Sequence, residues 1–161
     1  MITLTATELM VAAYVGSARN VQSLIQKWSP AASAGLHNTW TPNVEGAAGE
    51  MAAAKSLGIY WQPIIGNSNA DDVGFYQVRT NISRKHTDLC LRQRDNPDKI
   101  YISVLSFLPD FEILGWIFGR DGKLNKFLRD GSVDRPQCFY VPRTILYPMC
   151  EIPKQPEPKR S

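Results

Sequence analysis

Residues 70 to 80, ADDVGFYQVRT, combine paired acids at a turn with a polar strand end. The expected strand begins with Asp72 and ends with Gln77 and Arg79, which stand two positions apart and so share one face. A divalent ion acting on a phosphodiester needs oxygen ligands at fixed positions, which carboxylates and amides supply. We therefore interpret the stretch as a candidate metal site. The alternative is a turn in which Asp71 and Asp72 bond their own backbone.

Positive charge follows this stretch directly. Between residues 79 and 94, five cations stand against the single anion Asp88. The cations are Arg79, Arg84, Lys85, Arg92 and Arg94. The whole chain is only mildly basic, with a net charge of +3, so this local excess is the stronger indication of a nucleic-acid partner. These side chains either face phosphates or form a solvated strand face, and the sequence favours neither.

The chain of 161 residues is expected to form one domain over residues 1–150, followed by a mobile tail rich in proline and charge at 151–161. Its composition, 43% apolar and 20% charged, is typical of a globular protein and not of a disordered or membrane protein. Three cysteines without C-x-x-C spacing predict neither a disulfide scaffold nor a zinc site. The first residues lack the features of a signal peptide, so a cytosolic setting is expected.

Two helical regions are expected ahead of the candidate site. Thr5 and Glu8 have the spacing of a capping box, and apolar residues then recur at helical spacing to about Trp28, which indicates one long or two consecutive packed helices. A further helix is predicted over residues 44–58, with Pro42 suited to a first turn and a glycine at the C′ position. Its many small residues allow another element to approach its backbone closely.

This helix carries two glutamates, five residues apart, which do not share one face tightly. Glu50 lies in an apolar stripe, where a carboxylate needs a partner or an ion to offset its desolvation. Glu45, near the helix start, has a structural reason of its own, because it favours the positive end of the helix dipole. Glu50 is the expected inward acid, and the sequence alone leaves open which of the two faces the site.

Strands are predicted after the candidate site. The β-rich runs are residues 89–94, 100–106 and 111–118, and their short connections favour an antiparallel meander. A brief helix at 123–128 and a last strand at 138–141 follow. The expected class is α+β, with the N-terminal helices packed on a mostly antiparallel or mixed sheet of about four to five strands.

Five segments resemble a set of small bacteriophage proteins and, with them, the PD-(D/E)XK nuclease superfamily. They are EGAAGEMAAAKSLGIYW, DDVGFYQVRT, LCLRQRDNPDKIYISVL, FEILGWIFGRDGK and YVPRTILYP. Their order is similar to that of the superfamily: a helix glutamate, an aspartate after a turn, then an acid-x-base pair on a strand. The resemblance implies a restriction-endonuclease-like fold, nuclease activity on DNA with Mg²⁺ or Mn²⁺, and a phage-encoded protein in the host cytoplasm.

The resemblance also assigns roles residue by residue. Glu50 is the helix acid, Asp72 is the central metal-binding aspartate, and Gln77 stands in the place of the second acid, so these three form the implied metal site. Arg79 stands in the place of the lysine, which makes the motif a degenerate Q-x-R. Glutamine adds no negative charge and lowers the expected metal affinity. Arginine stabilises charge on a phosphate but cannot relay a proton.

The spacing of these residues requires a bend in the chain. Asp72 and Gln77 lie five positions apart, which is about 16 Å along a straight strand at ~3.3 Å per residue, too far to share an ion. Gly74 is the expected place for the bend, because glycine adopts the unusual backbone conformations that a sharp turn needs.

Functions of different classes remain open. The first is a metal-dependent DNA phosphodiesterase in which Glu50 and Asp72, with the Gln77 or Val78 carbonyl, hold Mg²⁺ while Arg79 stabilises the phosphate. The second is a non-catalytic phage accessory protein on a nuclease-like scaffold that binds DNA or a host or phage protein, its cations contacting phosphates. A structural or regulatory role is a third. A single site that cuts duplex DNA would need a dimer, and the sequence reveals no interface.

Overall fold

The computed structural model describes residues 1–25, 40–66, 70–82, 87–131 and 136–154. Its two long helices are α1 (Ala6–Ile25) and α2 (Trp40–Leu57). The first sheet contains β1 (Ile2–Thr3), β2 (Tyr76–Asn81), β4 (Ile100–Phe107) and β5 (Asp110–Phe118). The second contains β3 (Leu89–Arg92), β6 (Leu128–Arg129) and β7 (Cys138–Val141). The short elements are α3 (Gly119–Gly122) and 3-10 turns at Asn125–Phe127, Arg143–Ile145 and Met149–Glu151.

The first sheet is mixed, with the strand order β1-β5-β4-β2. β2 lies parallel to β4, whereas β4 pairs antiparallel with β5, and β5 with β1. The predicted α+β class, with N-terminal helices on a mixed sheet, is therefore confirmed. β2 is an edge strand, so one of its long sides is open for the chain segment that precedes it to fold against.

The predicted antiparallel meander is wrong at its first strand. β3 pairs with β7 in the second sheet and not with β4, although only a short turn separates β3 from β4. The physical reason lies in that turn, where the carboxylate of Asp95 accepts a hydrogen bond from the backbone N–H of Arg92 and ends the strand. The chain then enters β4 beside β2, and Leu89 and Leu91 are buried in a separate core.

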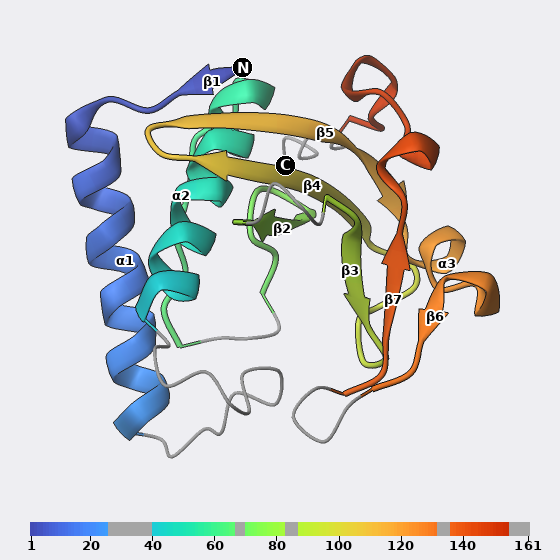
Figure 1. The fold of residues 1–161 in the computed structure, drawn as a ribbon. Helices are drawn as coiled ribbons and strands as arrows, with labels where there is room; N and C mark the ends of the chain where they lie inside the picture. The colour runs from blue at the N-terminus through green and yellow to red at the C-terminus, as the bar shows by residue number, and fades with distance from the viewer. Residues whose placement is uncertain (26–39, 67–69, 83–86, 132–135, 155–161) are drawn as a thin grey trace, which may run out of the picture.

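α2 is the middle layer of the molecule, with α1 on one side and the first sheet on the other (Figure 1). Its small residues make both contacts close. A Cβ atom added at Gly16 of α1 would lie 2.5 Å from the Cα of Val44, and one added at Gly49 would lie 1.9 Å from the Oγ1 of Thr80 in β2. The close approach predicted from the small residues of this helix is therefore confirmed.

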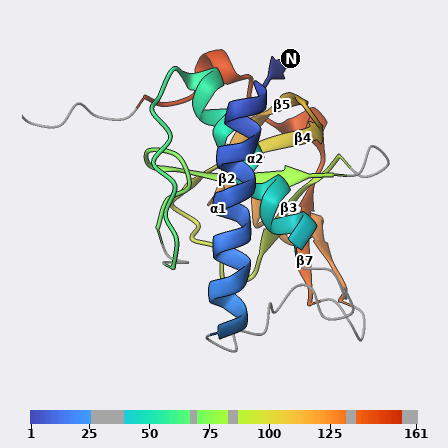
Figure 2. The same cartoon turned by 90° about the vertical axis from the view of Figure 1, so that its left-hand side faces the viewer.

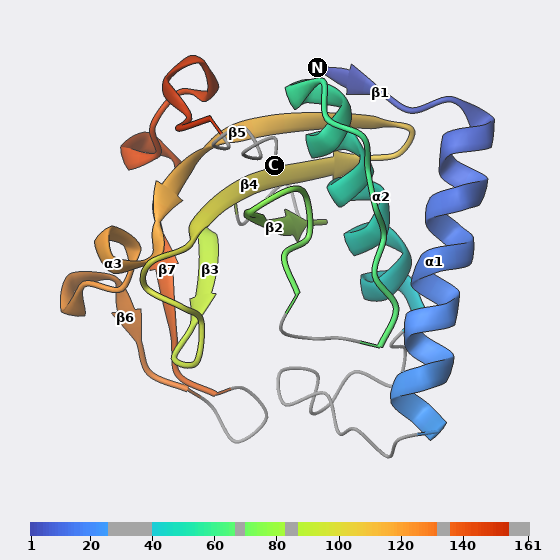
Figure 3. The same cartoon turned by 180° about the vertical axis from the view of Figure 1, so that it is seen from behind.

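The second core lies on the other face of β4 and β5. Ile100, Ile102 and Val104 point toward the helices, whereas Tyr101 between them joins the core beneath the second sheet. Seen from behind, β3 and β7 run side by side away from the β4–β5 pair (Figure 3). β4 is buried on both faces because each sheet has a hydrophobic core of its own.

The predicted start of α1 is confirmed, and part of its predicted packing is wrong. The backbone N–H of Thr5 donates to Glu8 at 2.6 Å and that of Glu8 to the Thr5 hydroxyl at 3.2 Å, which is the capping box. The described helix ends at Ile25, and residues 26–39, including the predicted end near Trp28, lie outside the described residues. The apolar residues of its last turns were expected to pack but are exposed, because α2 covers only the inner side.

The second long helix starts earlier than predicted. α2 begins at Trp40, which keeps Pro42 in the first turn but moves Glu45 beyond it, so the helix-dipole reason for Glu45 does not hold. Its end at Gly58, with a φ of 66°, is as predicted. The brief helix predicted at 123–128 is instead a 3-10 turn preceded by α3.

The packed part of the chain extends beyond the predicted boundary at residue 150. Glu151 ends a 3-10 turn, and the hydroxyl of Tyr76 donates to the carbonyl oxygen of Pro153 at 2.6 Å. The rest of the predicted tail, residues 155–161, lies outside the described residues. Among the helices that are described, none has both the length and the apolar character needed to cross a membrane.

Candidate functional site

The bend predicted at Gly74 is confirmed and brings Asp72 back beside β2. Gly74 has a φ of 60°, and Val73 and Tyr76 form an isolated antiparallel bridge around it. The backbone N–H of Asp72 donates to the carbonyl of Tyr76 at 3.0 Å. The Asp72 carboxylate accepts the backbone N–H of Val78 at 2.7 Å. Asp72 therefore lies against the middle of β2 and not one straight strand length away from it.

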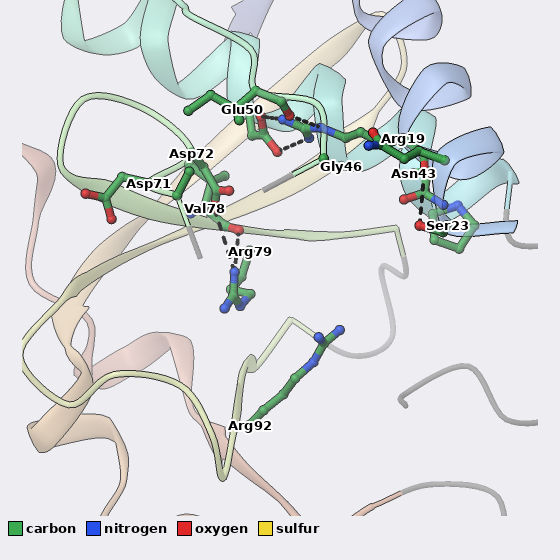
Figure 4. Close-up of a pocket in the computed structure, with 15 residues that line it drawn as sticks. Arg19, Ser23, Asn43, Gly46, Glu50, Asp71, Asp72, Val78, Arg79 and Arg92 are labelled. Atoms are coloured by element: carbon green, nitrogen blue, oxygen red, sulfur yellow. Dashed lines mark hydrogen bonds and ion pairs between the residues drawn. The ribbon is translucent and has the colours of Figure 1, made fainter. Parts of the chain in front are cut away.

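β2 separates the candidate residues into two groups. Val78 is buried toward α2, and its neighbours Gln77 and Arg79 share the opposite face, as predicted. Glu50 lies on α2, so it and Arg79 are on opposite sides of the strand (Figure 4). Asp72 lies along the edge of β2, where its carboxylate interacts electrostatically with both Glu50 and Arg79.

Glu50 is the inward acid of α2, and its charge is already balanced. Its side chain is 8% exposed, and its two oxygens accept hydrogen bonds from the guanidinium of Arg19 at 2.5 and 2.9 Å. The indole N–H of Trp61 donates to the same carboxylate at 3.3 Å. Figure 4 shows Arg19 reaching from α1 to Glu50 above β2. The partner that desolvation demands is therefore an arginine of the first helix.

Asp72 is less well compensated. Burial is the main reason that its pKa is raised to about 6, and the nearby carboxylate of Glu50 raises it further. The Val78 N–H and the guanidinium of Arg79, whose Nη1 lies 3.8 Å from Asp72, offset only part of this effect. Asp72 therefore carries a proton on a substantial fraction of molecules at mildly acidic pH.

The side chain of Gln77 is held by Asp71 and not by Glu50 or Asp72. Its side-chain amide nitrogen donates to the carboxylate of Asp71 at 2.8 Å and to the carbonyl of Ala70 at 3.3 Å. Lys99 forms an ion pair with the same aspartate at 2.7 Å. Asp71 is thus held by side chains from β2 and from the turn before β4, which is a fuller structural role than the predicted turn alone.

The residues of the predicted metal site do not fit a shared ion as they are placed. Both oxygens of Glu50 bond to Arg19, and the amide of Gln77 is engaged with Asp71. A hard cation needs several oxygens that are free to converge on one point. Asp71 and Glu50 line the same cavity as Asp72, but their carboxylates are paired with Lys99 and Arg19. Across the part of the chain that the structure describes, no group of three or more His, Cys, Asp or Glu residues is arranged to hold a metal.

Arg79 is fixed by contacts on three sides. Its guanidinium donates to the carboxylate of Asp95 at 3.1 Å and to the carbonyl of Val78 at 3.1 Å. It also lies over the ring of Tyr101, 5.2 Å from the centroid. Because Asp95 is bonded in turn to the backbone of Arg92, it links Arg79 of β2 to β3 of the second sheet, where Arg92 lies.

Arg92 is a half-buried cation without a paired acid in the described part of the chain. Burial lowers its pKa, and the guanidinium groups of Arg79 and Arg94 lower it further by repulsion. Its guanidinium makes no hydrogen bond or ion pair with any residue that the structure describes. Figure 4 shows this side chain extending into the same space as Arg79. Two half-buried cations therefore face one space, and of the two only Arg79 is paired with acids among the described residues.

Arg79 and Arg92 stand where three cavities meet. The first cavity, about 350 Å³, lies toward α1 and α2 and also contacts Arg19, Glu50 and Asp72. The second, about 400 Å³, adds Arg94 and Lys99, and the third, about 880 Å³, adds Arg129. We call the space they form together the arginine groove. Cations outnumber acids in the lining of the second and third cavities, and the two are equal in number in the first.

Two of the four predicted nucleic-acid-binding residues, Arg84 and Lys85, lie outside the described residues. The other two, Arg92 and Arg94, line the arginine groove. Arg19 and Asp95, which fix Glu50 and Arg79, were not foreseen. Arg19 had one sequence signal, because it is the only cation between Ala6 and Ile25. Asp95 had none beyond its place in a predicted turn.

Comparisons with protein-family models, with curated proteins and with solved structures find no match to this chain. The resemblance to the PD-(D/E)XK superfamily, with the nuclease activity and phage origin it implies, therefore stays an untested prediction.

Proposed function

We propose that the protein binds the phosphodiester backbone of nucleic acid in the arginine groove. The observation that carries this proposal is the pair formed by Arg79 and Arg92, two half-buried guanidinium groups that repel each other. An anion between them removes the repulsion and provides the hydrogen-bond acceptors that Arg92 lacks among the described residues. Phosphate suits this role because the planar fork of arginine bonds two of its oxygens at once.

The arrangement favours a polymer over a single small anion. The three cavities are connected through Arg79 and Arg92, and further cations lie on their outer walls: Arg94, Lys99 and Arg129. A chain of phosphates can contact several such groups in succession, whereas one phosphate can occupy only one cavity. Arg79 is held in place by Asp95 and Tyr101, so little side-chain freedom is lost when a phosphate binds.

A binding titration tests this proposal. Fluorescence anisotropy with labelled single-stranded and duplex oligonucleotides compares the wild type with Arg92→Gln, which keeps a polar side chain and removes the charge. The matched control is Arg120→Gln, because Arg120 stacks on Phe118 and lines none of the three cavities. We expect Arg92→Gln to weaken binding to every sequence and Arg120→Gln to leave it unchanged. Equal affinities of all three proteins would refute the proposal.

A second candidate function is metal-dependent hydrolysis of the bound phosphodiester. It is favoured by one observation, the carboxyl of Asp72 with its pKa raised by burial and by Glu50, next to Arg79. Two acids whose charges repel beside a phosphate-facing arginine are an arrangement that a cation would stabilise. Glu50 and Asp72 could both bind a metal ion only after Arg19 leaves the Glu50 carboxylate.

Cleavage assays separate the two functions. Linear, nicked and single-stranded DNA are incubated with the protein in Mg²⁺ or Mn²⁺, alongside Glu50→Ala and Asp72→Ala. Cleavage that is lost in both variants supports hydrolysis at this site, and cleavage that survives both would remove the site assignment. Salt-sensitive binding without cleavage supports the binding function alone.

A further inference from the structure

The outer face of α1 carries large apolar side chains between Met10 and Ile25. Its large side chains are exposed although they are hydrophobic, and Met10, Tyr14 and Ile25 are 66%, 72% and 76% exposed. The other exposed members are Val11, Val21 and Leu24. Figure 2 shows α1 as the outermost layer, in front of α2 and the sheets. A continuous apolar stripe of this kind on a helix marks a contact surface.

No charged residue interrupts this stripe. The only charged residues of α1 are Glu8 and Arg19, and both are engaged elsewhere. Glu8 bonds to Lys55 of α2 at 2.8 Å, and Arg19 is paired with Glu50 on the inner side. An exposed face without charge can meet an identical face without placing like charges against each other.

The stripe is also symmetric about its middle. Residues 10 and 25, 11 and 24, and 14 and 21 are each equidistant from the point between Ser17 and Ala18. When a helix packs antiparallel on a copy of itself across a two-fold axis at that point, every large apolar residue lies level with another. The smallest side chains, Ser17 and Ala18, then lie at the crossing, where the two helices approach most closely. An antiparallel pair also aligns the helix dipoles favourably.

We propose that this protein forms a two-fold symmetric dimer in which the α1 helices of two copies pack antiparallel through this stripe. α1 has 20 residues, a length of about 30 Å, which suffices for an interface of several helical turns. An apolar hollow of about 560 Å³ runs along the stripe from Tyr14 to Ile25 and is also lined by Trp40. In the antiparallel arrangement Met10 of the second copy lies level with Ile25, where its flexible side chain can fill this hollow.

The first test is the mass of the protein in solution. Light scattering coupled to size-exclusion chromatography is expected to give a dimer for the wild type and a monomer for Tyr14→Glu, which places two charges in the seam. The control is Tyr60→Glu, because Tyr60 is 82% exposed and lies outside α1. Circular dichroism of each variant shows that it is folded. A monomeric wild type at micromolar concentration, or a folded Tyr14→Glu that stays dimeric, would overturn the proposal.

Cross-linking tests the orientation of the helices. In a Cys150→Ser background, which removes the exposed native thiol, Met10→Cys and Ile25→Cys are oxidised separately and as a mixture. The antiparallel pair is expected to give disulfide-linked dimers in the mixture and few in either variant alone. Efficient linkage of Met10→Cys to itself indicates a parallel pair and would overturn the antiparallel arrangement.

Discussion

Replacing Arg19 should destabilise the protein more than replacing the acid that it pairs with. In Arg19→Met the carboxylate of Glu50, 8% exposed, keeps only the Trp61 N–H at 3.3 Å. A buried charge left without its partner costs about 3–5 kcal/mol. In Glu50→Leu the guanidinium of Arg19, 22% exposed, can still reach water and the carbonyl of Ile64, so we expect a cost of about 1–3 kcal/mol.

Urea unfolding followed by tryptophan fluorescence measures these costs, because Trp61 lies against the pair. The double variant Arg19→Met/Glu50→Leu should cost less than the sum of the single variants, because neither charge is left alone. The control is Glu112→Ala, which breaks the exposed pair with Arg143 and should cost less than ~1 kcal/mol. An Arg19→Met variant as stable as this control would refute a structural role for the pair.

Two further predictions concern the acid of the groove and the helix contact. Asp72 has a pKa of about 6 in the folded protein, above its unfolded value of ~3.9. The folded protein therefore binds this proton more tightly than the unfolded chain, so the free energy of unfolding falls as the pH rises from about 4 to about 6. Asp72→Asn should remove a decrease on the order of 2 kcal/mol from the pH profile of urea unfolding, and an unchanged profile would contradict the raised pKa. Gly16→Ala should destabilise by about 1–3 kcal/mol, because its Cβ would lie 2.5 Å from the Val44 Cα. Gly46→Ala, which meets no atom within 4 Å, should stabilise by about 0.5–1 kcal/mol in thermal unfolding, and equal effects of the two would contradict the close helix contact.

Local features of the fold could be predicted from the sequence. The capping box at Thr5, the C-terminal glycine of α2, the inward position of Glu50 and the bend at Gly74 all follow from the properties of single residues or short patterns. Each is confirmed because the physical cause is contained in a few neighbouring positions. The shared face of Gln77 and Arg79 follows in the same way from the strand period.

The sequence does not predict which strands pair or which side chains contact each other across the fold. The β-rich pattern at Leu89 shows a strand but not its neighbour, and the second sheet that receives it is completed about fifty residues later in the chain, at β7. The role of Arg19 depends on the packing of α1 against α2, which periodicity does not specify. The sequence predicts the apolar residues at the end of α1 to be packed, because a hydrophobic pattern does not distinguish a covered helix face from an exposed one.

The salt dependence of nucleic-acid binding tests the central proposal most directly. Each phosphate neutralised by a protein cation contributes about −0.9 to the slope of log K against log salt concentration for duplex DNA. We expect Arg92→Gln to reduce the magnitude of this slope by about 1 and Arg120→Gln to leave it unchanged. A slope that is identical in the wild type and Arg92→Gln would show that Arg92 contacts no phosphate and would contradict binding in the arginine groove.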